Sequence, residues 1–109
     1  MITPQDIFEK EIPAALLANP KVVKNLNAIV HFDLTGPNGG VWTLDATVVP
    51  AQVAQGAVGK PDLTMTINAA DFVKIRQKKA NPQMLMMQGK LKMTPLNIGL
   101  AMKLAQVLG

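Results

Sequence analysis

The sequence predicts an α+β fold in which a mostly antiparallel sheet has one apolar face and helices cover that face. Two patterns carry this prediction. Several segments alternate apolar and polar residues with a period of two, and the segments around them begin with capping residues and prolines, as helices do. The chain has 109 residues, of which 49% are hydrophobic and 4% aromatic, so we expect one domain over residues 1–109 with an aliphatic, methionine-containing core.

The first helix is predicted to begin within the first few residues. Thr3 can cap it, Pro4 suits its first position, and Asp6 lies near the positive end of the helix dipole. Pro13 is expected to interrupt the hydrogen-bond ladder, and a second helical piece then ends before Pro20. The segment after that proline either leads into the first strand or forms a further short helix.

Three regular strands are predicted next, the first two joined as an antiparallel hairpin by the GPNGG turn at residues 36–40. A less regular segment, residues 51–55, is a candidate for another strand between the second and third. The apolar positions of the regular strands are Val30, Phe32 and Leu34, then Trp42, Leu44, Ala46 and Val48, then Leu63, Met65 and Ile67. The intervening positions form a second face, which we expect to be exposed to water.

The last third of the chain repeats a cap-and-helix pattern. Asn68 is predicted to cap a helix that ends near Lys79, and Asn81 a short helix that stops at Gly89. Residues 90–93 then form a final strand. A last helix is expected from Thr94 and Pro95 to about Leu108.

The inventory of reactive side chains is small, which argues against catalysis. There is no cysteine, and His31 is the only histidine, predicted on the polar face of a strand without a partner. Asp33 and Asp45 lie on the same predicted face and could approach each other, but acid–base catalysis would require their burial, which the alternation pattern argues against. GAVGK at residues 56–60 lacks the spacing and the following helix of a phosphate-binding loop. No catalytic residue, metal site or cofactor is therefore predicted.

A net charge of +4 raises the question of anionic partners. The densest basic region has no interleaved aromatic residues, so nucleic acid is not predicted as a partner. Two interpretations stay open: a solvated helix face, or weak, transient contact with an anionic membrane surface. The sequence shows neither a signal peptide nor an apolar run of membrane-spanning length, which predicts a cytoplasmic protein. The basic residues are Lys74, Arg76, Lys78, Lys79, Lys90 and Lys92.

The last predicted helix is apolar around most of its circumference, with only Gly99, Lys103 and Gln106 on a narrow opposite strip. A helix that packs on a sheet needs a narrower apolar stripe, and a small monomer rarely exposes such a surplus. Three explanations remain: another subunit covers it, other helices bury it, or it forms the wall of a cavity for an apolar ligand.

Four stretches of the sequence resemble the sterol carrier protein type 2 domain, in that family's order and spacing. They are HFDLTGPNGGVWTLD (31–45), GKPDLTMTINAADFVKI (59–75), NPQMLMMQGKLK (81–92) and GLAMKL (99–104). The resemblance implies a five-stranded sheet with an apolar tunnel between sheet and helices. It also implies non-catalytic binding and transfer of fatty acids, fatty acyl-CoA, sterols or phospholipids. The closing VLG differs from a peroxisomal signal, and no fused enzyme accompanies the domain, so a stand-alone form of prokaryotic type is expected.

Carried over by position, the resemblance places ten residues in the lipid site, with Gln88 a polar candidate near the mouth. The predicted lining is Phe72, Ile75, Leu85, Met86, Gln88, Leu91, Met93, Ile98, Met102 and Leu104. An alternative is the same fold used as an interaction module, in which the last helix pairs two copies as a homodimer or docks on an enzyme of lipid or isoprenoid metabolism. The TPLNIG segment before the last helix departs from the family pattern.

Overall fold

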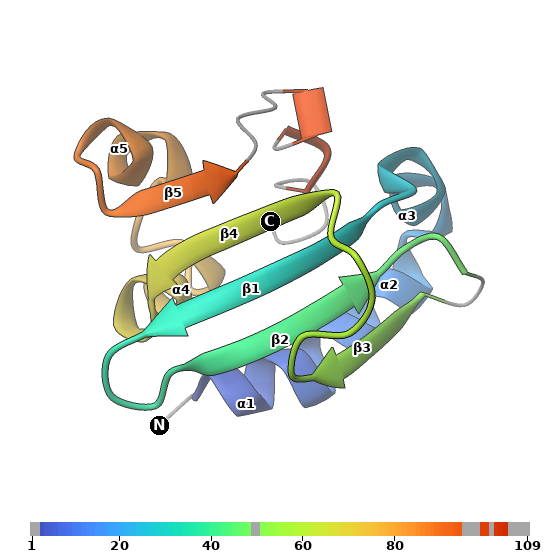
Figure 1. The fold of residues 1–109 in the computed structure, drawn as a ribbon, viewed down its shortest axis with the longest axis horizontal. Helices are drawn as coiled ribbons and strands as arrows, with labels where there is room; N and C mark the ends of the chain where they lie inside the picture. The colour runs from blue at the N-terminus through green and yellow to red at the C-terminus, as the bar shows by residue number, and fades with distance from the viewer. Residues whose placement is uncertain (1–2, 49–50, 95–98, 101, 105–109) are drawn as a thin grey trace.

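A computed structural model of the chain describes residues 3–48, 51–94, 99–100 and 102–104. Its helical elements are α1 (Pro4–Asp6), the π-helix η1 (Ile7–Glu11), α2 (Ile12–Ala18), α3 (Pro20–Leu26), α4 (Ala69–Arg76) and α5 (Pro82–Met87). Its strands are β1 (Ile29–Thr35), β2 (Gly40–Asp45), β3 (Gln52–Gln55), β4 (Leu63–Asn68) and β5 (Leu91–Thr94). Figure 1 shows these elements along the chain.

Within the described residues the strands form one five-stranded sheet in the order β3-β2-β1-β4-β5. The β1–β2, β2–β3 and β4–β5 pairs are antiparallel, and the β1–β4 pair is parallel. The predicted α+β fold and the predicted hairpin are therefore confirmed, and the irregular segment after the hairpin is the edge strand β3. The sheet is mixed because the connection from β3 to β4 passes β2 and β1 and places β4 parallel to β1.

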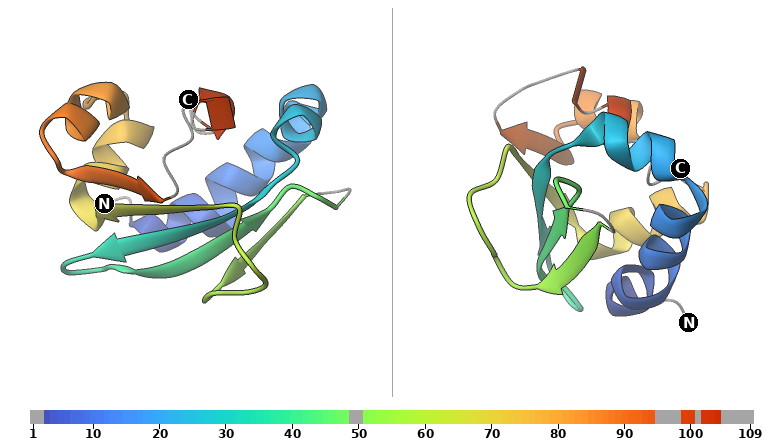
Figure 2. Two further views of the ribbon diagram at one scale, coloured as in Figure 1. Left: turned by 45° about the horizontal axis from the view of Figure 1, so that its top comes forward. Right: turned by 90° about the vertical axis from the view of Figure 1, so that its right-hand side faces the viewer.

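The helices lie on one side of the sheet, as the two views of Figure 2 show. The apolar alternate residues of the central strands face them, and the register aligns Trp42, Phe32 and Met65 in one row across three strands. This row and its neighbours form the core with the inner sides of the helices. The largest fully buried side chains are Phe8, Phe32, Phe72, Ile7, Ile12, Leu44, Leu63, Ile67, Leu104 and Val30.

The helical path from Pro4 to Ala18 continues past Pro13, contrary to the prediction of an interruption there. Thr3 and Asp6 form a reciprocal capping box at its start. In an α-helix the Pro13 ring would clash with the carbonyl of residue 9, but here the preceding turn is widened. The Ile12 N–H donates to the carbonyl of Ile7, five residues earlier. The π-helical segment thus places a proline within a continuous helical path.

The outer face of the sheet is covered at its centre by the β3–β4 connection, which crosses in front of β2 and β1 in Figure 1. Thr43 Oγ1 donates to the Gly56 carbonyl at 2.7 Å and accepts from the Val58 N–H at 3.0 Å. His31 Nε2 lies 3.0 Å from the Val58 carbonyl oxygen. The expectation of a face wet throughout was wrong here: His31 is 9% exposed and Thr43 is 2% exposed.

The caps predicted at Asn68 and Asn81 are confirmed. Asn68 Oδ1 accepts from the Ala70 N–H, and Asn81 Oδ1 accepts from the Gln83 N–H. Helix α4 ends at Arg76, earlier than expected, and Gly89 follows α5 with a φ of +74°. The left-handed backbone explains why glycine stands at the predicted stop.

The last helix is described at five positions, all helical: 99–100 and 102–104. Leu104 is fully buried and Leu100 packs on the core, whereas Met102 is 61% exposed. Leucines four residues apart share one side of a helix, so this side faces the domain. The predicted lining residue Ile98 and the end of the predicted helix lie outside the described residues.

Candidate functional site

The four aromatic residues of the chain gather between the sheet and the amino-terminal helical segment. The ring of Phe8 stacks on Trp42 at a centroid distance of 5.0 Å and on Phe72 at 5.1 Å. Phe32 meets Phe8 edge-on, with centroids 5.0 Å apart. Each such pair adds about 0.5–1.5 kcal/mol beyond the area that it buries. Phe8 therefore links helix, sheet and α4 at one point.

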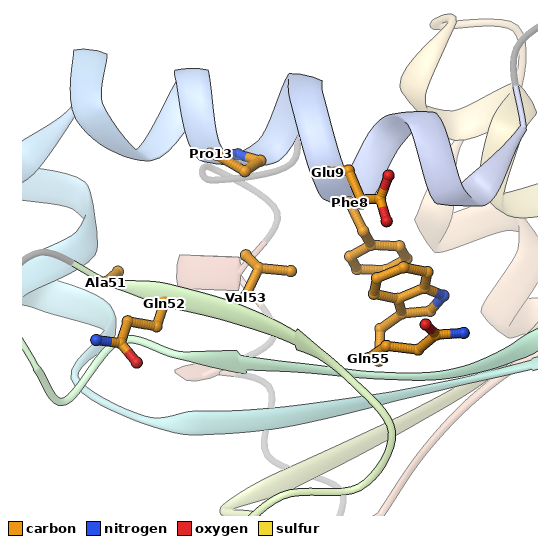
Figure 3. Close-up of a pocket in the computed structure, with 8 residues that line it drawn as sticks. Phe8, Glu9, Pro13, Ala51, Gln52, Val53 and Gln55 are labelled. Atoms are coloured by element: carbon orange, nitrogen blue, oxygen red, sulfur yellow. The ribbon is translucent and has the colours of Figure 1, made fainter.

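A pocket of about 470 Å³ opens beside this cluster, between the helical segment and the β3 edge of the sheet (Figure 3). Its volume falls within the range of ordinary small-molecule sites. The sheet register places Gln55 beside Trp42 and Val53 beside Leu44, so both β3 side chains lie on the inner face. The pocket is lined by Phe8, Glu9, Pro13, Trp42, Ala51, Gln52, Val53 and Gln55.

The lining divides into an apolar base and a polar mouth. Phe8 is fully buried and Trp42 is 6% exposed, while Gln52, Gln55 and Glu9 are exposed. Glu9 accepts a hydrogen bond from Gln5 Nε2 at 3.2 Å. Gln52 alternates with Val53 and Gln55, so its side chain lies toward the outer face, and the mouth offers the Gln55 amide and the Glu9 carboxylate. Such a pocket can hold an apolar body inside and hydrogen-bond a polar end outside.

The predicted lining residues lie mainly on another part of the same core. Phe72, Ile75, Leu85, Leu91 and Leu104 are buried, and none of them lines the 470 Å³ pocket. They belong to α4, α5, β5 and the last helix. Two further predicted residues, Met86 and Met93, are partly buried and pack on this core, whereas Gln88 and Met102 are exposed. Phe72 connects the two regions because its ring stacks on Phe8.

The reactive side chains considered in the sequence do not converge. Asp33 pairs with Val41 and Asp45 with Ile29, so the two carboxylates lie toward opposite ends of the hairpin. His31 contacts a backbone carbonyl on the covered outer face, away from the pocket. Among the described residues, no three His, Cys, Asp or Glu side chains are grouped so that they could hold a metal ion.

The basic residues of the last third are mostly exposed. Arg76 is the exception: it pairs with Glu11 at 3.1 Å and ties α4 to the amino-terminal helical segment. Lys90 and Lys92 line a second, polar pocket of about 330 Å³ at the end of β4. No helix in the described part of the chain is long and apolar enough to cross a membrane.

These features define a small α+β domain with helices on one face of a mixed sheet, an apolar interior, and an opening at one sheet edge. Comparison with known proteins gives its family. The chain belongs to the SCP-2 sterol transfer family, whose model matches residues 10–109. The domain of this family is a lipid-binding and lipid-transfer fold, so the predicted resemblance is confirmed.

Solved structures agree with this assignment. The sterol carrier protein domain 2 of Helicoverpa armigera is 32% identical in sequence, with a TM-score of 0.74 over 98% of this chain and 90% of that one. Sterol carrier protein 2 of Yarrowia lipolytica, in its apo form, is 28% identical, with a TM-score of 0.73 over 90% of this chain and 84% of that one.

A similar domain also occurs within longer proteins. Hydroxysteroid dehydrogenase-like protein 2 of Xenopus tropicalis is 37% identical over 94 residues, which are 85% of this chain and 22% of that protein. The chain therefore spans about a fifth of the length of the curated relatives that it matches.

The sequence did not identify the β3-edge pocket. Trp42 was predicted on an apolar strand face, but nothing local indicated that its ring stacks on Phe8. Val53 and Gln55 come from a four-residue strand, too short for alternation to reveal which face is buried. The available signal was the irregularity of this strand, which is typical of a sheet edge.

Proposed function

We propose that residues 1–109 act as one non-catalytic lipid-binding domain that carries an apolar molecule between the sheet and the helices. The observation that carries this proposal is the β3-edge pocket, whose base is the buried Phe8–Trp42 stack in a member of a lipid-transfer family. The pocket carries polar side chains at its edge and reaches the aromatic stack at its base, an arrangement that suits an amphipathic lipid.

The same proposal extends the site toward the predicted lining. The aromatic stack leads from the pocket to Phe72, which belongs to the same buried cluster as Leu85 and Leu91 of the predicted set. An acyl chain that ran between sheet and helices would follow this direction. Each buried methylene contributes about 0.8 kcal/mol, so a long chain can offset the cost of association.

The mouth favours a ligand with an uncharged polar end. The Gln55 amide can donate and accept hydrogen bonds, whereas the Glu9 carboxylate repels a second anion. A sterol-like hydroxyl fits this mouth better than a fatty acid carboxylate or the phosphates of acyl-CoA. Among the four ligand classes that the family resemblance implies, sterol-like molecules are therefore the first to test.

Native mass spectrometry of delipidated protein provides the test, with cholesterol, palmitic acid and palmitoyl-CoA as separate probes. We expect a one-to-one complex with at least one probe at micromolar concentration, and no complex with any of them would refute lipid carriage. Val53→Trp fills the pocket and should weaken binding at least tenfold. Val58→Trp adds the same ring on the outer face, where Val58 is 54% exposed, and should leave binding unchanged.

A second pair of variants tests the predicted lining. Met86 is partly buried on the inner side of α5, and Met102 is 61% exposed on the last helix. If the ligand reaches this region, Met86→Lys should weaken binding, whereas Met102→Lys, on the outer side of the last helix, should leave it unchanged, and circular dichroism should show that both proteins fold. Binding that is lost in Val53→Trp but kept in both lysine variants would confine the ligand to the β3-edge pocket.

The alternative function, an interaction module or homodimer, is favoured by one observation. Leu100 and Leu104 pack on the domain, which leaves Met102 and Lys103 on the outer side of the last helix. A second copy could cover that side. Sedimentation equilibrium separates the alternatives: a tight dimer that Met102→Lys dissociates supports the interaction module, and a monomer with a lipid bound supports the carrier.

A further inference from the structure

Charge is divided unequally along the chain. All seven aspartate and glutamate residues occur at or before Asp71, whereas seven of the eleven lysine and arginine residues follow it. Residues 72–109 therefore carry a formal charge of +7 and residues 1–71 carry −3. An acid-free stretch of this kind attracts anionic surfaces; in the fold, Glu11 offsets the charge of Arg76, and Asp71 lines the same pocket as Lys90 and Lys92.

Helix α5 lies within this stretch and exposes two large apolar side chains. Met84 is 57% exposed and Met87 is 87% exposed, while Leu85 between them is 7% exposed and packs on the core. Residues three apart lie on the same side of a helix, so the two methionines form one outward patch. Figure 1 shows α5 at an outer corner of the molecule, beside β5.

Lysines lie at both ends of this patch. Lys78 and Lys79 occupy the exposed turn before α5, and the Lys90 N–H donates to the carbonyl of Leu85 at 2.9 Å, which holds Lys90 at the other end. A six-residue helix is about 9 Å long, so all three are within reach of the surface that the methionines meet. We call Lys78, Lys79, Met84, Met87 and Lys90 the methionine–lysine face.

We propose that the methionine–lysine face docks the domain on an anionic lipid bilayer. Unbranched, polarisable methionine side chains can enter the irregular boundary between headgroups and acyl chains, and lysines beside them contact anionic headgroups. An acidic protein would satisfy the lysines, but a bilayer also removes both exposed methionines from water without needing a matched pocket.

Docking in this orientation has a consequence for lipid transfer. This consequence rests on the proposed function. The inner side of α5 supplies Leu85 and Met86, two residues of the predicted lining. The face would therefore bring the α5 wall to the bilayer, at the opposite edge of the sheet from the β3-edge pocket, so transfer in this orientation requires a ligand that extends between sheet and helices as far as α5. Docking itself needs no bound ligand, so the two proposals can fail independently.

Flotation of the full chain with vesicles tests the docking. Wild type should float with phosphatidylcholine vesicles that contain phosphatidylserine, bind pure phosphatidylcholine far more weakly, and be released by salt. The triple variant K78Q/K79Q/K90Q should bind the anionic vesicles roughly a hundredfold more weakly. M84S/M87S should weaken binding roughly tenfold or more without changing its relative response to salt.

The chain offers matched controls for both changes. K21Q/K24Q removes two exposed lysines from α3, and Leu17→Ser removes a side chain that is 74% exposed on α2. Both should retain wild-type vesicle binding. All substitutions are at exposed positions, and circular dichroism checks that each variant folds.

Three results would overturn the proposal. The first is equal binding of wild type to anionic and neutral vesicles. The second is a loss of binding in the control variants as large as that in the face variants. The third is a dimer, detected by sedimentation, that M84S/M87S dissociates. The dimer would show that the two methionines contact a second copy of the chain instead of a bilayer. Vesicle binding that persists in the Val53→Trp variant separates docking from lipid binding.

Discussion

Phe8 holds together three parts of the molecule that are distant in sequence. Its fully buried ring contacts Trp42 of β2, Phe32 of β1 and Phe72 of α4, and it also lines the β3-edge pocket. A residue with these contacts stabilises the fold and shapes the proposed site at the same time. Its substitution should therefore affect both.

Phe8→Ala is expected to lower the free energy of unfolding by about 3–5 kcal/mol, because it removes a large buried ring and leaves a cavity. Leu17→Ala is the control, since that side chain is 74% exposed, and it should change stability by less than about 0.5 kcal/mol. Urea unfolding followed by the fluorescence of Trp42 measures both. Equal effects of the two substitutions would contradict the central role of Phe8.

The capping box at the start of α1 predicts a pH dependence. Hydrogen bonds from the Thr3 N–H and hydroxyl lower the pKa of the Asp6 carboxyl below 3.8 in the folded chain. The ionised group therefore contributes stability that is fully present above about pH 4 and is lost as pH falls through the folded pKa. The stability difference between wild type and Asp6→Asn should shrink on acidification, as thermal unfolding in a pH series can measure.

Thr3→Ala provides the internal check on this pH effect. It removes the hydroxyl that contributes to the lowered pKa, so in its background Asp6→Asn should have a smaller, less pH-dependent effect. An unchanged difference in that background would assign the pH dependence to another carboxylate.

At the scale of elements, the β3–β4 connection determines which part of the outer sheet face meets water. Thr43 holds it with two hydrogen bonds, one to Gly56 and one from Val58. Thr43→Val keeps the shape but leaves a carbonyl and an N–H without this partner, which should cost about 1–3 kcal/mol. Hydrogen exchange at the Val58 amide should accelerate, whereas Thr35→Val, at an exposed position of β1, should leave that amide protected.

The elements also indicate where sequence reasoning succeeds. The caps at Thr3, Asn68 and Asn81 are local devices, so their residues predict them directly. The parallel pairing of β1 with β4 and the burial of His31 depend on a crossover between distant segments, which periodicity does not encode. The tolerance of Pro13 within the helical path depends on a π-turn that no local propensity marks.

The candidate site could also be predicted only in part. The apolar faces of the strands and helices were predictable, and with them the burial of Phe72, Leu91 and Leu104. The pocket at the β3 edge was not, because it requires the edge strand, the π-helical segment and the Phe8–Trp42 stack in one place. The sequence predicted only a methionine-containing core, whereas the structure exposes Met84 and Met87 of α5.

For the whole molecule, lipid carriage predicts a change in global stability. A ligand that binds only the folded protein stabilises it by mass action, by about 2.7 kcal/mol when the free ligand is a hundredfold above its Kd. For a domain of 109 residues this corresponds to a rise in Tm of roughly 10 °C. Calorimetry of delipidated protein with increasing cholesterol or fatty acid measures this shift.

The effect of each variant on the ligand-induced rise in Tm shows where in the fold the ligand binds. Val53→Trp should abolish the rise in Tm, because the ring occupies the pocket before any ligand arrives, whereas Val58→Trp should preserve it. M84S/M87S should also preserve it, since the methionine–lysine face serves docking and the pocket serves binding. A rise in Tm that survives Val53→Trp but disappears in Met86→Lys would move the ligand to the region between α5 and the sheet.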